Sequence, residues 1–450
     1  MLKQRFCRLH NLKNLPISMF YFTSGNREKV VFTNSDRPET YTLDGKRFVT
    51  DQTWNISPTV RKLVKRHLLS EQFNPLTLLK QRIVDYMHEA YRKPGKIDII
   101  FDRDRTPMFT VCENEGRIVS TFDNFDSLLV PLDHVSRKTT NTYYVNNSHC
   151  LRAHTSAHQY RLLQEGLDAF LIIGDVYRRD EIDSSHFPCF HQVEGVRLFS
   201  SHQLLNFMPG DNIPIFENGE RTATKQEKHT DDAANALKIQ LQCTLEELTS
   251  AIFGNDCVKR WVDTYFPFTH PSFELEIFHN GKWLEVLGCG IMEQRLLENA
   301  GVKNKVGWAF GLGLERIAMV LYDIPDIRLF WTKDSGFLSQ FNGKSPMDYV
   351  KYKPISVHPQ VIFDMSFYLP KGVVFDDMTA NVFDTVRNVG GDLIEQVILT
   401  DEFINKRNQM SQTYRIVYRS HTRALTKAEV NVIHKQIACQ LIQCYGVSLR

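Results

Sequence analysis

Residues 169–199, AFLIIGDVYRRDEIDSSHFPCFHQVEGVRLF, carry the pattern from which the fold of this chain can be predicted. The run from Ala169 to Ile173 is uniformly apolar, which indicates a buried strand, and residues 188–199 alternate as a half-buried strand does. Further strands are predicted at 97–101, 108–112, 273–278 and 283–288, the last two separated by the turn His279-Asn280-Gly281. Because few of these strands alternate with helices, the sequence predicts an α+β fold with an antiparallel sheet.

Helices are predicted where capping residues precede apolar residues at helical spacing. Asn74 followed by Pro75 should begin one helix, which extends to about Tyr91. Residues 209–232 are polar and rich in turn residues, so we expect a surface insertion there, followed by a helix over 233–253.

A second domain is predicted at the C-terminus. Glycine and proline residues punctuate a polar segment at 343–359, which indicates a linker, and the chain beyond it is long enough to fold independently. Its predicted elements are a strand at 361–368, a helix at 380–389 that breaks at Gly390-Gly391, strands at 393–399 and 413–419, and a helix opened by the capping box Thr426/Glu429. This β-α-β-β-α order, with a last strand at the C-terminus, is the ferredoxin-like pattern.

The amino-acid composition limits the classes of protein to which this chain can belong. The chain has 450 residues, of which 42% are hydrophobic and 24% charged, which excludes a disordered, collagen-like or coiled-coil protein. The formal charge is only +2, so a nucleic-acid-binding role would have to come from a local patch. No stretch approaches the roughly 18 uninterrupted apolar residues of a membrane helix, and we expect a soluble protein. Nine scattered cysteines without a C-x-x-C pair are typical of free thiols in a reducing compartment.

The first 27 residues contain basic side chains but no acid, and the first acid is Glu28. Basic, acid-free leaders with scattered hydroxyl groups are typical of mitochondrial transit peptides. Two alternatives stay open, a short secretory apolar region over 15–22 and a solvated basic tail.

One face of the strand at 188–199 has the chemistry of a binding site. Side chains alternate along a strand, so Phe190, Gln192 and Glu194 must share a face. This set makes a poor core, because an unpaired carboxylate is costly to bury, but it suits a ligand with a planar base and an ammonium group. Arg178, at the end of the preceding strand, could reach a phosphate with its planar guanidinium. An exposed sheet face with a salt bridge is the alternative interpretation.

Four other segments concentrate groups suited to ligand binding. In GWAFGLGLER (307–316), Gly311 and Gly313 let the backbone approach a ligand, and Arg316 falls in the first turn of a helix. RAHTSAH (152–158) supplies hydrogen-bonding groups, and YFPFTHPS (265–272) supplies aromatic walls, although aromatic residues more often belong to a core. WLEVLGCG (283–290) places Glu285 between apolar neighbours, where a metal ion or hydroxyl would satisfy it.

Taken together and in this order, these segments resemble the three motifs of the class II aminoacyl-tRNA synthetases, and within them the single-chain mitochondrial phenylalanyl-tRNA synthetases. The resemblance runs from about Asn74 to Arg450 and includes NFDSLLVP, HTSAH, VYRRD…FHQVEG, FPFTHPS, EVLGCG, WAFGLGLER, FDMSFYLP and GGDLIEQV. Two departures occur: Asp180 stands where many class II members have glutamate, and residues 134–137 read HVSR where family members usually read HPAR.

The resemblance implies a class II antiparallel catalytic domain followed by a ferredoxin-fold anticodon-binding domain. The expected boundaries are a transit peptide at 1–27, an N-terminal extension at 28–73, a catalytic domain at 74–342, a linker at 343–358 and an anticodon-binding domain at 359–450. The implied activity is ATP-dependent activation of L-phenylalanine to phenylalanyl-adenylate and its transfer to tRNA(Phe) in the mitochondrial matrix. ATP is the implied co-substrate with Mg²⁺, and the single-chain type resembles a monomer.

Residue by residue, the resemblance implies three sets of contacts. Arg178 would hold the α-phosphate and Arg316 the γ-phosphate of a bent ATP, Ser184, Ser185 and His186 would assist the phosphates, Phe190 would stack on adenine, and Glu285 would contact Mg²⁺ through water. Phenylalanine would be bound by His154, Thr155, Ser156, Ala157, His158, His191, Gln192, Glu194, Ala309, Phe310 and Gly311, with its ring sandwiched edge-to-face by Phe266 and Phe268. The tRNA would be contacted by Arg415, Arg419 and Arg423, with Tyr414 and Tyr418 stacking on anticodon bases.

Two alternatives of a different kind were weighed. A catalytically silent paralogue acting as an RNA-binding or regulatory protein would be expected to have lost Arg178, Glu194 or Arg316, and all three are present. A class II-like ligase that uses no tRNA is disfavoured by the basic C-terminal segment, because residues 401–450 hold eight basic and three acidic side chains. The class I synthetase patterns H-I-G-H and K-M-S-K-S are absent.

Overall fold

The computed structural model describes residues 37–92, 106–113, 115–179, 181–205, 214–333, 335–354, 358–373, 375–405, 409–420 and 422–450. The transit peptide predicted at 1–27, the strand predicted at 97–101 and Asp180 lie outside these residues. Among the residues described, no helix combines the length and the hydrophobicity needed to cross a bilayer.

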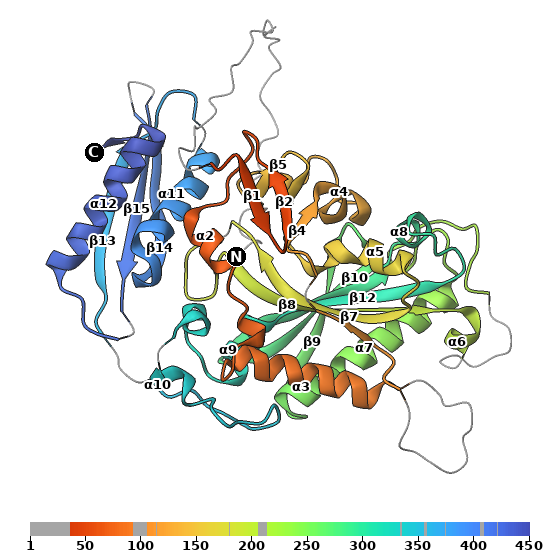
Figure 1. The fold of residues 1–450 in the computed structure, drawn as a ribbon. Helices are drawn as coiled ribbons and strands as arrows, with labels where there is room; N and C mark the ends of the chain where they lie inside the picture. Colours follow the sequence, from red (N-terminus) through yellow and green to blue (C-terminus); the bar gives the residue numbers. More distant parts are fainter. Residues whose placement is uncertain are drawn as a thin grey trace, which may run out of the picture. The chain divides into compact units, whose positions relative to one another are not determined.

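A seven-stranded sheet forms the centre of the first domain (Figure 1). Its strands, in spatial order, are β3 (Thr110–Cys112), β7 (Ala169–Tyr177), β8 (Cys189–Phe199), β12 (Val306–Gly313), β11 (Lys282–Met292), β10 (Thr269–His279) and β9 (Lys259–Phe266). All neighbouring pairs are antiparallel except β3 and β7, which are parallel. The predicted antiparallel α+β fold is confirmed.

β7, β10 and β11 are longer than the sequence patterns indicated, and β9 and β12 were not predicted. Strands β10 and β11 are joined by a hairpin in which His279 pairs with Lys282, and Asn280 and Gly281 turn the chain with φ values of 48° and 77°. Because both turn residues have positive φ, this is the two-residue hairpin that an Asn-Gly pair favours. The glycine-containing segment that was expected to approach a ligand is the central strand β12, and its Gly311 pairs with Gly288 on one side and Glu194 on the other.

Three helices cover one face of the sheet, α3 (Pro75–Ala90), α7 (Asp231–Phe253) and α9 (Leu314–Leu321) (Figure 1). α3 begins as predicted: the side chain of Asn74 accepts a hydrogen bond from the Leu76 amide, and Pro75 follows it. The side-chain amide of Asn74 also donates a hydrogen bond to the carbonyl of Phe330 at 3.0 Å. This bond fixes the start of the helix to a segment that is distant in sequence.

The other face carries the smaller elements. They are the three-stranded sheet of β4 (Ile118–Ser120), β6 (His149–Leu151) and β5 (Tyr144–Asn146), and helices α4 (Thr121–Asn124), α5 (Gln159–Gln164) and α8 (Gln294–Asn299). α6 (Ser201–Leu205) follows β8, and α10 (Ser335–Leu338) lies near the end of the domain. A hydrophobic cluster that includes Phe125, Leu162 and Ala309 fills the space on this face.

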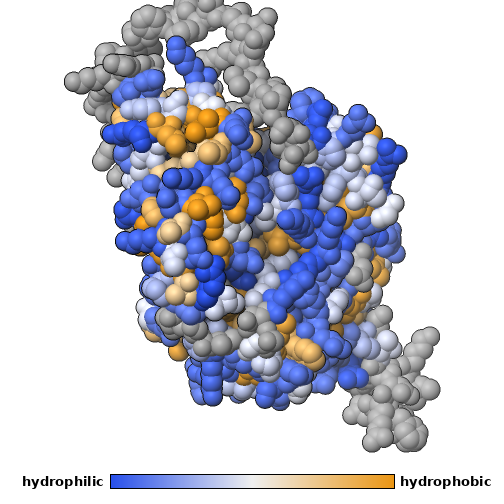
Figure 2. All heavy atoms as spheres, turned by 60° about the vertical axis from the view of Figure 1, so that its left-hand side comes forward, coloured by the Kyte–Doolittle hydropathy of each residue, from blue (hydrophilic) through white to orange (hydrophobic). Residues whose placement is uncertain are grey.

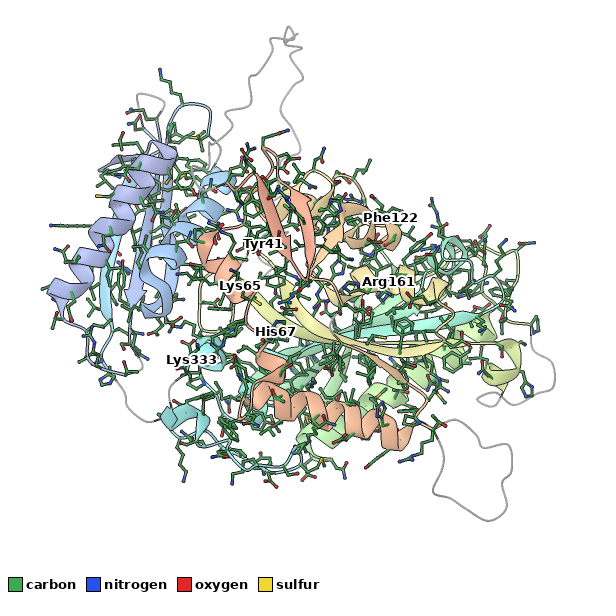
Figure 3. The ribbon with its side chains drawn as sticks, viewed as in Figure 1. Tyr41, Lys65, His67, Phe122, Arg161 and Lys333 are labelled. Atoms are coloured by element: carbon green, nitrogen blue, oxygen red, sulfur yellow. The ribbon has the colours of Figure 1, made fainter. Side chains whose placement is uncertain are left out.

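The N-terminal extension packs onto this domain through polar anchors. It contains the hairpin β1 (Thr40–Leu43) and β2 (Lys46–Val49) and the helix α2 (Pro58–Leu63), and it carries Tyr41, Lys65 and His67 (labelled in Figure 3). The Arg66 guanidinium pairs with Glu71 at 2.6 Å and donates to the Trp331 carbonyl. The extension is therefore attached to the segment after α9.

The predicted surface insertion at 209–232 is described over residues 214–232, most of which are exposed as expected. Gln226 and His229 are among the exceptions: both are buried, and the Gln226 side-chain amide donates to the carbonyls of His270 and Met292. These polar residues are buried because each satisfies backbone or side-chain groups of the sheet end and of α8. The polar sequence therefore predicted exposure correctly for most of the segment but not for these residues.

The C-terminal module comprises β13 (Val361–Tyr368), α11 (Phe375–Gly390), β14 (Ile394–Ile404), β15 (Met410–Tyr418), α12 (Lys427–Tyr445) and β16 (Ser448–Leu449). The strand order β14-β15-β13-β16 and the capping box between Thr426 and Glu429 agree with the prediction. The module has a hydrophobic cluster of its own. Figure 2 shows one side of the molecule, where hydrophobic patches interrupt a largely hydrophilic surface; exposed apolar residues of the module include Ile362, Ile398 and Ile404.

Replacing Gly195 with alanine should destabilise the sheet. A Cβ at this position would collide with the ring of Phe310, its partner on β12. We expect the free energy of unfolding to fall by about 1–3 kcal/mol, the usual effect of overpacking, as measured by denaturant titration. Gly311→Ala is the matched control, because a Cβ on Gly311 meets no atom within 4 Å. Equal losses in the two variants would contradict this account.

Candidate active site

A cleft of about 520 Å³ opens on the face of the sheet opposite α3 and α7. Its floor is formed by β8, β12 and β11, which contribute Gln192, Glu194, Ala309, Gly311 and Gly288. The volume lies in the range of small-molecule sites, roughly 300–1,000 Å³.

Glu194 lies at the closed end of this cleft and is only 3% exposed. Its carboxylate accepts hydrogen bonds from the hydroxyls of Thr155 at 2.8 Å and Ser156 at 2.6 Å, and from the amide of Gln159. Burial raises the pKa of Glu194, and these donors oppose that effect only in part. The chain thus builds a buried carboxylate, supported by neutral donors, that can receive a cation.

His154 lines the same end of the cleft and stays neutral. Burial, together with the nearby Arg178 guanidinium, lowers the pKa of His154 to about 3. At neutral pH it can therefore offer a hydrogen bond but not a positive charge that would compete for Glu194.

Arg178 lines the cleft, and Arg316 is linked to the cleft through Glu285. Arg178 donates from Nε to the Ala153 carbonyl at 2.8 Å, and its guanidinium carbon lies 5.1 Å from the centre of the Phe190 ring. Arg316, at the start of α9, pairs with Glu285 at 3.1 Å; Glu285 lines the cleft, whereas Arg316 itself does not. One guanidinium group therefore lines the cleft directly, and the second is one ion pair away from it.

Phe266 and Phe268 form an aromatic wall on one side of the cleft. Their ring centres are 5.9 Å apart and their planes differ by 12°, so the two rings stack on each other. A third ring does not fit face to face between them, because stacked aromatic rings need several ångströms on each side. The expected edge-to-face contact with a ligand ring, which needs only the outer faces or edges of this wall, stays a prediction.

Comparisons with known proteins agree with this site. The model of the tRNA synthetase class II core domain (F) matches residues 87–207 and 233–341, and that of the ferredoxin-fold anticodon-binding domain matches 356–450. The mitochondrial phenylalanine–tRNA ligase of Mus musculus is 48% identical over 409 residues, covering 90% of this chain and 88% of that protein. This chain belongs to the mitochondrial phenylalanine–tRNA ligase family. The chloroplastic/mitochondrial phenylalanine–tRNA ligase of Arabidopsis thaliana is 44% identical, covering 89% of this chain and 83% of that protein.

Among solved structures, a pyrrolysyl-tRNA synthetase from Desulfitobacterium hafniense aligns with a TM-score of 0.39 and 13% identity. The alignment covers 58% of this chain and 74% of that chain, and we draw no conclusion from it. Membership of the phenylalanine–tRNA ligase family rests on the curated relatives and the domain models.

Two residues that were expected to bind phenylalanine turn their rings toward the covered face of the sheet. The His191 ring faces the helices, where Nδ1 lies 2.6 Å from Glu315, and His191 does not line the cleft. The Phe310 ring packs on Trp308, with ring centres 5.9 Å apart, but Phe310 still belongs to the cleft lining. Both orientations follow from alternation, because each residue neighbours one that points into the cleft. The expected contact of Phe310 with the amino acid therefore stays a prediction.

Within the segment 154–158, only His154 and Ser156 line the cleft. The Thr155 hydroxyl donates a hydrogen bond to Glu194, Ala157 packs in the hydrophobic cluster, and His158 lies 3.0 Å from the Arg152 guanidinium. The three are therefore positioned to support the site and not to touch a ligand.

The loop between β7 and β8 presents the remaining expected phosphate contacts. His186 Nδ1 lies 2.8 Å from Asp183, and the Ser185 amide and hydroxyl bond to the same carboxylate. The Ser184 carbonyl accepts from the Ile327 amide at 2.8 Å. Asp183 thus organises this loop, and sequence reasoning had not singled it out.

Other lining residues were also missed. They include Val130, His134, Val135, Ser136, Asn141, Thr142 and Arg179. Gln159, which donates to Glu194, was missed as well, because one amide at the start of a helix carries no sequence signal. Val130 lies in the family motif NFDSLLVP and residues 134–136 in the departing HVSR segment, so both could have been found from the resemblance.

The expected RNA-binding face of the C-terminal module needs correction. Tyr414 and Tyr418 are fully buried in the module's hydrophobic cluster, so they cannot stack on bases, and the expectation is wrong. Arg415, Arg419 and Arg423 pair with Asp364, Glu395 and Glu429, at 2.8, 3.0 and 2.9 Å respectively. Arg415 and Arg423 remain about half exposed and can still exchange a carboxylate for a phosphate.

A buried ion pair joins the segment after β6 to the central sheet. Arg152, whose side chain is 2% exposed, pairs with Asp175 of β7 at 2.7 Å. Burial is the largest single effect on the pKa of Asp175 and would raise it, but Arg152, His191, the Tyr177 hydroxyl and Arg117 together hold the pKa below its ordinary value. The stabilisation is therefore present above the ordinary pKa of about 3.8 and lost as pH falls through the depressed one.

Asp175→Asn should remove this stabilisation and leave Arg152 buried without its charge partner. We expect the free energy of unfolding at pH 7 to fall by about 3–5 kcal/mol, measured by denaturant titration. Asp168→Asn is the control, because Asp168 pairs with Lys305 where the two side chains are 45% and 28% exposed, and it should cost about 1 kcal/mol or less. A loss no larger in Asp175→Asn than in the control would contradict the assignment.

Proposed function

We propose that this chain is a phenylalanine–tRNA ligase that forms phenylalanyl-adenylate from L-phenylalanine and ATP in the cleft and transfers the amino acid to tRNA(Phe). The observation that carries the proposal is a buried carboxylate, Glu194, in the same cleft as Arg178, with Arg316 paired to the lining residue Glu285. A zwitterionic amino acid beside a polyphosphate needs this charge arrangement.

The amino acid would enter with its ammonium group toward Glu194. Ser156, Gln192 and His154 line this end and can orient it, while its ring lies against the wall of Phe266 and Phe268. Gly311 leaves the floor open, because no atom lies within 4 Å of where its Cβ would be. Rejection of smaller apolar amino acids follows from lost burial, at about 25 cal/mol per Å².

ATP would lie over β8 toward the open end. Phe190 offers a ring face for adenine, and Arg178 above that ring would hold the α-phosphate while the carboxylate of phenylalanine attacks it. Arg316 would break its ion pair with Glu285 and bind the γ-phosphate instead, with His186 assisting. The protein's task in this in-line displacement is positioning and charge stabilisation, and none of its side chains needs to act as a nucleophile.

Mg²⁺ fits this site only as part of the nucleotide complex. Among the described residues, no cluster of three or more histidine, cysteine or acidic side chains could hold a metal ion by itself. Glu285, half-exposed at the cleft, is the carboxylate that would hold Mg²⁺ together with phosphate oxygens and water. Bound there, the ion would neutralise phosphate charge.

The C-terminal module would bind the anticodon arm through exposed arginines, Arg415 and Arg423 foremost. The relatives' names place them in mitochondria, and the basic, acid-free residues 1–27 support import as a transit peptide. We propose the mitochondrial matrix as the compartment and a monomer as the working unit. The domain limits 28–73, 74–342, 343–358 and 359–450 belong to the same proposal.

The test is ATP–pyrophosphate exchange with a panel of amino acids, which needs no tRNA. We expect phenylalanine to support exchange with the highest kcat/KM of the panel. Arg178→Ala should lower this kcat/KM by about 100-fold to 1,000-fold, as expected when a charge contact to the reacting phosphate is removed. A wild-type chain without phenylalanine-dependent exchange would overturn the proposal in favour of a silent RNA-binding paralogue.

The pH dependence of phenylalanine binding tests Glu194 in particular. Because burial raises its pKa, Glu194 should become protonated at a higher pH than an ordinary carboxyl and lose its attraction for the ammonium group. We expect KM for phenylalanine in the exchange assay to rise as pH falls through that raised pKa, approaching about tenfold per pH unit.

Glu194→Gln provides the reference for this profile. It should have a high KM that no longer changes over the same pH range, because the amide does not titrate. If the wild-type KM stayed constant down to pH 4.5 while the protein remained folded, Glu194 would not be the ammonium contact.

A further inference from the structure

The loop that joins β7 to β8 (loop 178–188, described except for Asp180) is held by the C-terminal module. The Arg387 guanidinium donates to the carbonyl of Glu181 at 2.8 Å, and the Val397 amide donates to the carbonyl of Ile182 at 2.9 Å. The Ile182 side chain is 5% exposed and belongs to the hydrophobic cluster of the module. The loop that carries the proposed phosphate contacts thus inserts an apolar side chain into the other domain.

A buried ion pair fixes the start of this loop. Arg179, next to Arg178 in the chain, pairs with Asp384 of α11 at 2.7 Å, and both side chains are 7% exposed. Asp384 also lies 3.6 Å from Arg387 and accepts a hydrogen bond from the Tyr143 hydroxyl at 3.3 Å. One carboxylate therefore serves two buried guanidinium groups, and its removal would leave both without the charge that they share.

The phenylalanine end of the cleft is built differently. Glu194 and its donors Thr155, Ser156 and Gln159 come from β8, η4 (Thr155–His158) and α5 of the catalytic domain. The contacts of Asp384 are with Arg179, Arg387 and Tyr143. A change at Asp384 should therefore reach the nucleotide end of the cleft and spare the amino-acid end.

We propose that Asp384 is a positioning residue for adenylate formation: through Arg179, the docked C-terminal module holds loop 178–188 so that Arg178 and His186 face ATP. This deepens the proposed function and rests on it. The module then serves the first half-reaction, in which no RNA takes part. Since coupling between two equilibria is reciprocal, ATP binding must also stabilise the docked module.

The first experiment is ATP–pyrophosphate exchange by Asp384→Asn in the full chain without tRNA. We expect KM for ATP to rise by about tenfold and KM for phenylalanine to change by less than about twofold, because binding energy is lost only at the nucleotide end. Asp364→Asn is the matched control, since it removes an exposed pair with Arg415 in the same module, where the side chains are 46% and 47% exposed, and should leave both constants unchanged.

An unchanged KM for ATP, or an equal rise for both substrates, would overturn the proposal. The ATP–pyrophosphate exchange rate of the wild-type chain separates this failure from failure of the proposed function. If the wild-type chain shows no phenylalanine-dependent exchange, the proposed function itself is wrong; if it does and only the expected effect of Asp384→Asn is missing, the positioning role is wrong.

The second experiment needs no variant, so it decides the matter even if Asp384→Asn does not fold. Hydrogen–deuterium exchange of the wild-type chain would be followed with and without saturating ATP at the Val397 amide, which bonds to Ile182. We expect exchange at Val397 to slow by about fivefold or more with ATP. The Arg450 amide, which bonds to Ser366 within the module, should not change. Equal exchange at Val397 in both conditions would show that docking and ATP binding are independent.

Discussion

The buried charge of Glu194 is the constraint on which the rest of the cleft depends. A carboxylate at 3% exposure is tolerable only with hydrogen-bond donors around it, and the chain supplies them from Thr155, Ser156 and Gln159. Those donors require the segment after β6 to pack against β8. Neutral donors leave the negative charge of the carboxylate uncompensated, which is the property on which the proposed ammonium contact depends.

The central position of β12 explains how the site stays open while the sheet stays packed. Its side chains alternate between Phe310, which fills the covered face beside Trp308, and the small Ala309 and Gly311, which floor the cleft. Gly195 on β8 makes room for the Phe310 ring. Small residues on one face and large residues on the other let one strand serve both a core and a binding site.

Buried charges also need partners where the two domains meet. Arg179 and Arg387 are buried where the loop after β7 meets α11, and they share Asp384. Buried ion pairs add little net stability but are costly to break. Their main effect is therefore to specify one docking geometry, and their contribution to the stability of the docked state is small. Because Arg179 is adjacent to Arg178 in the chain, the proposed phosphate contact would be linked mechanically to the position of the module.

Local patterns in the sequence determined much of this protein. The Asn74 cap, the Asn280-Gly281 turn, the Thr426–Glu429 box and the shared face of Gln192 and Glu194 depend on neighbours within a few residues. Only the tertiary structure decided which face of each strand is covered: it turned His191 and Phe310 toward the helices, buried Tyr414 and Tyr418, and stacked Phe266 on Phe268. The reason is physical, since periodicity fixes which side chains point together, whereas long-range packing fixes what lies opposite them.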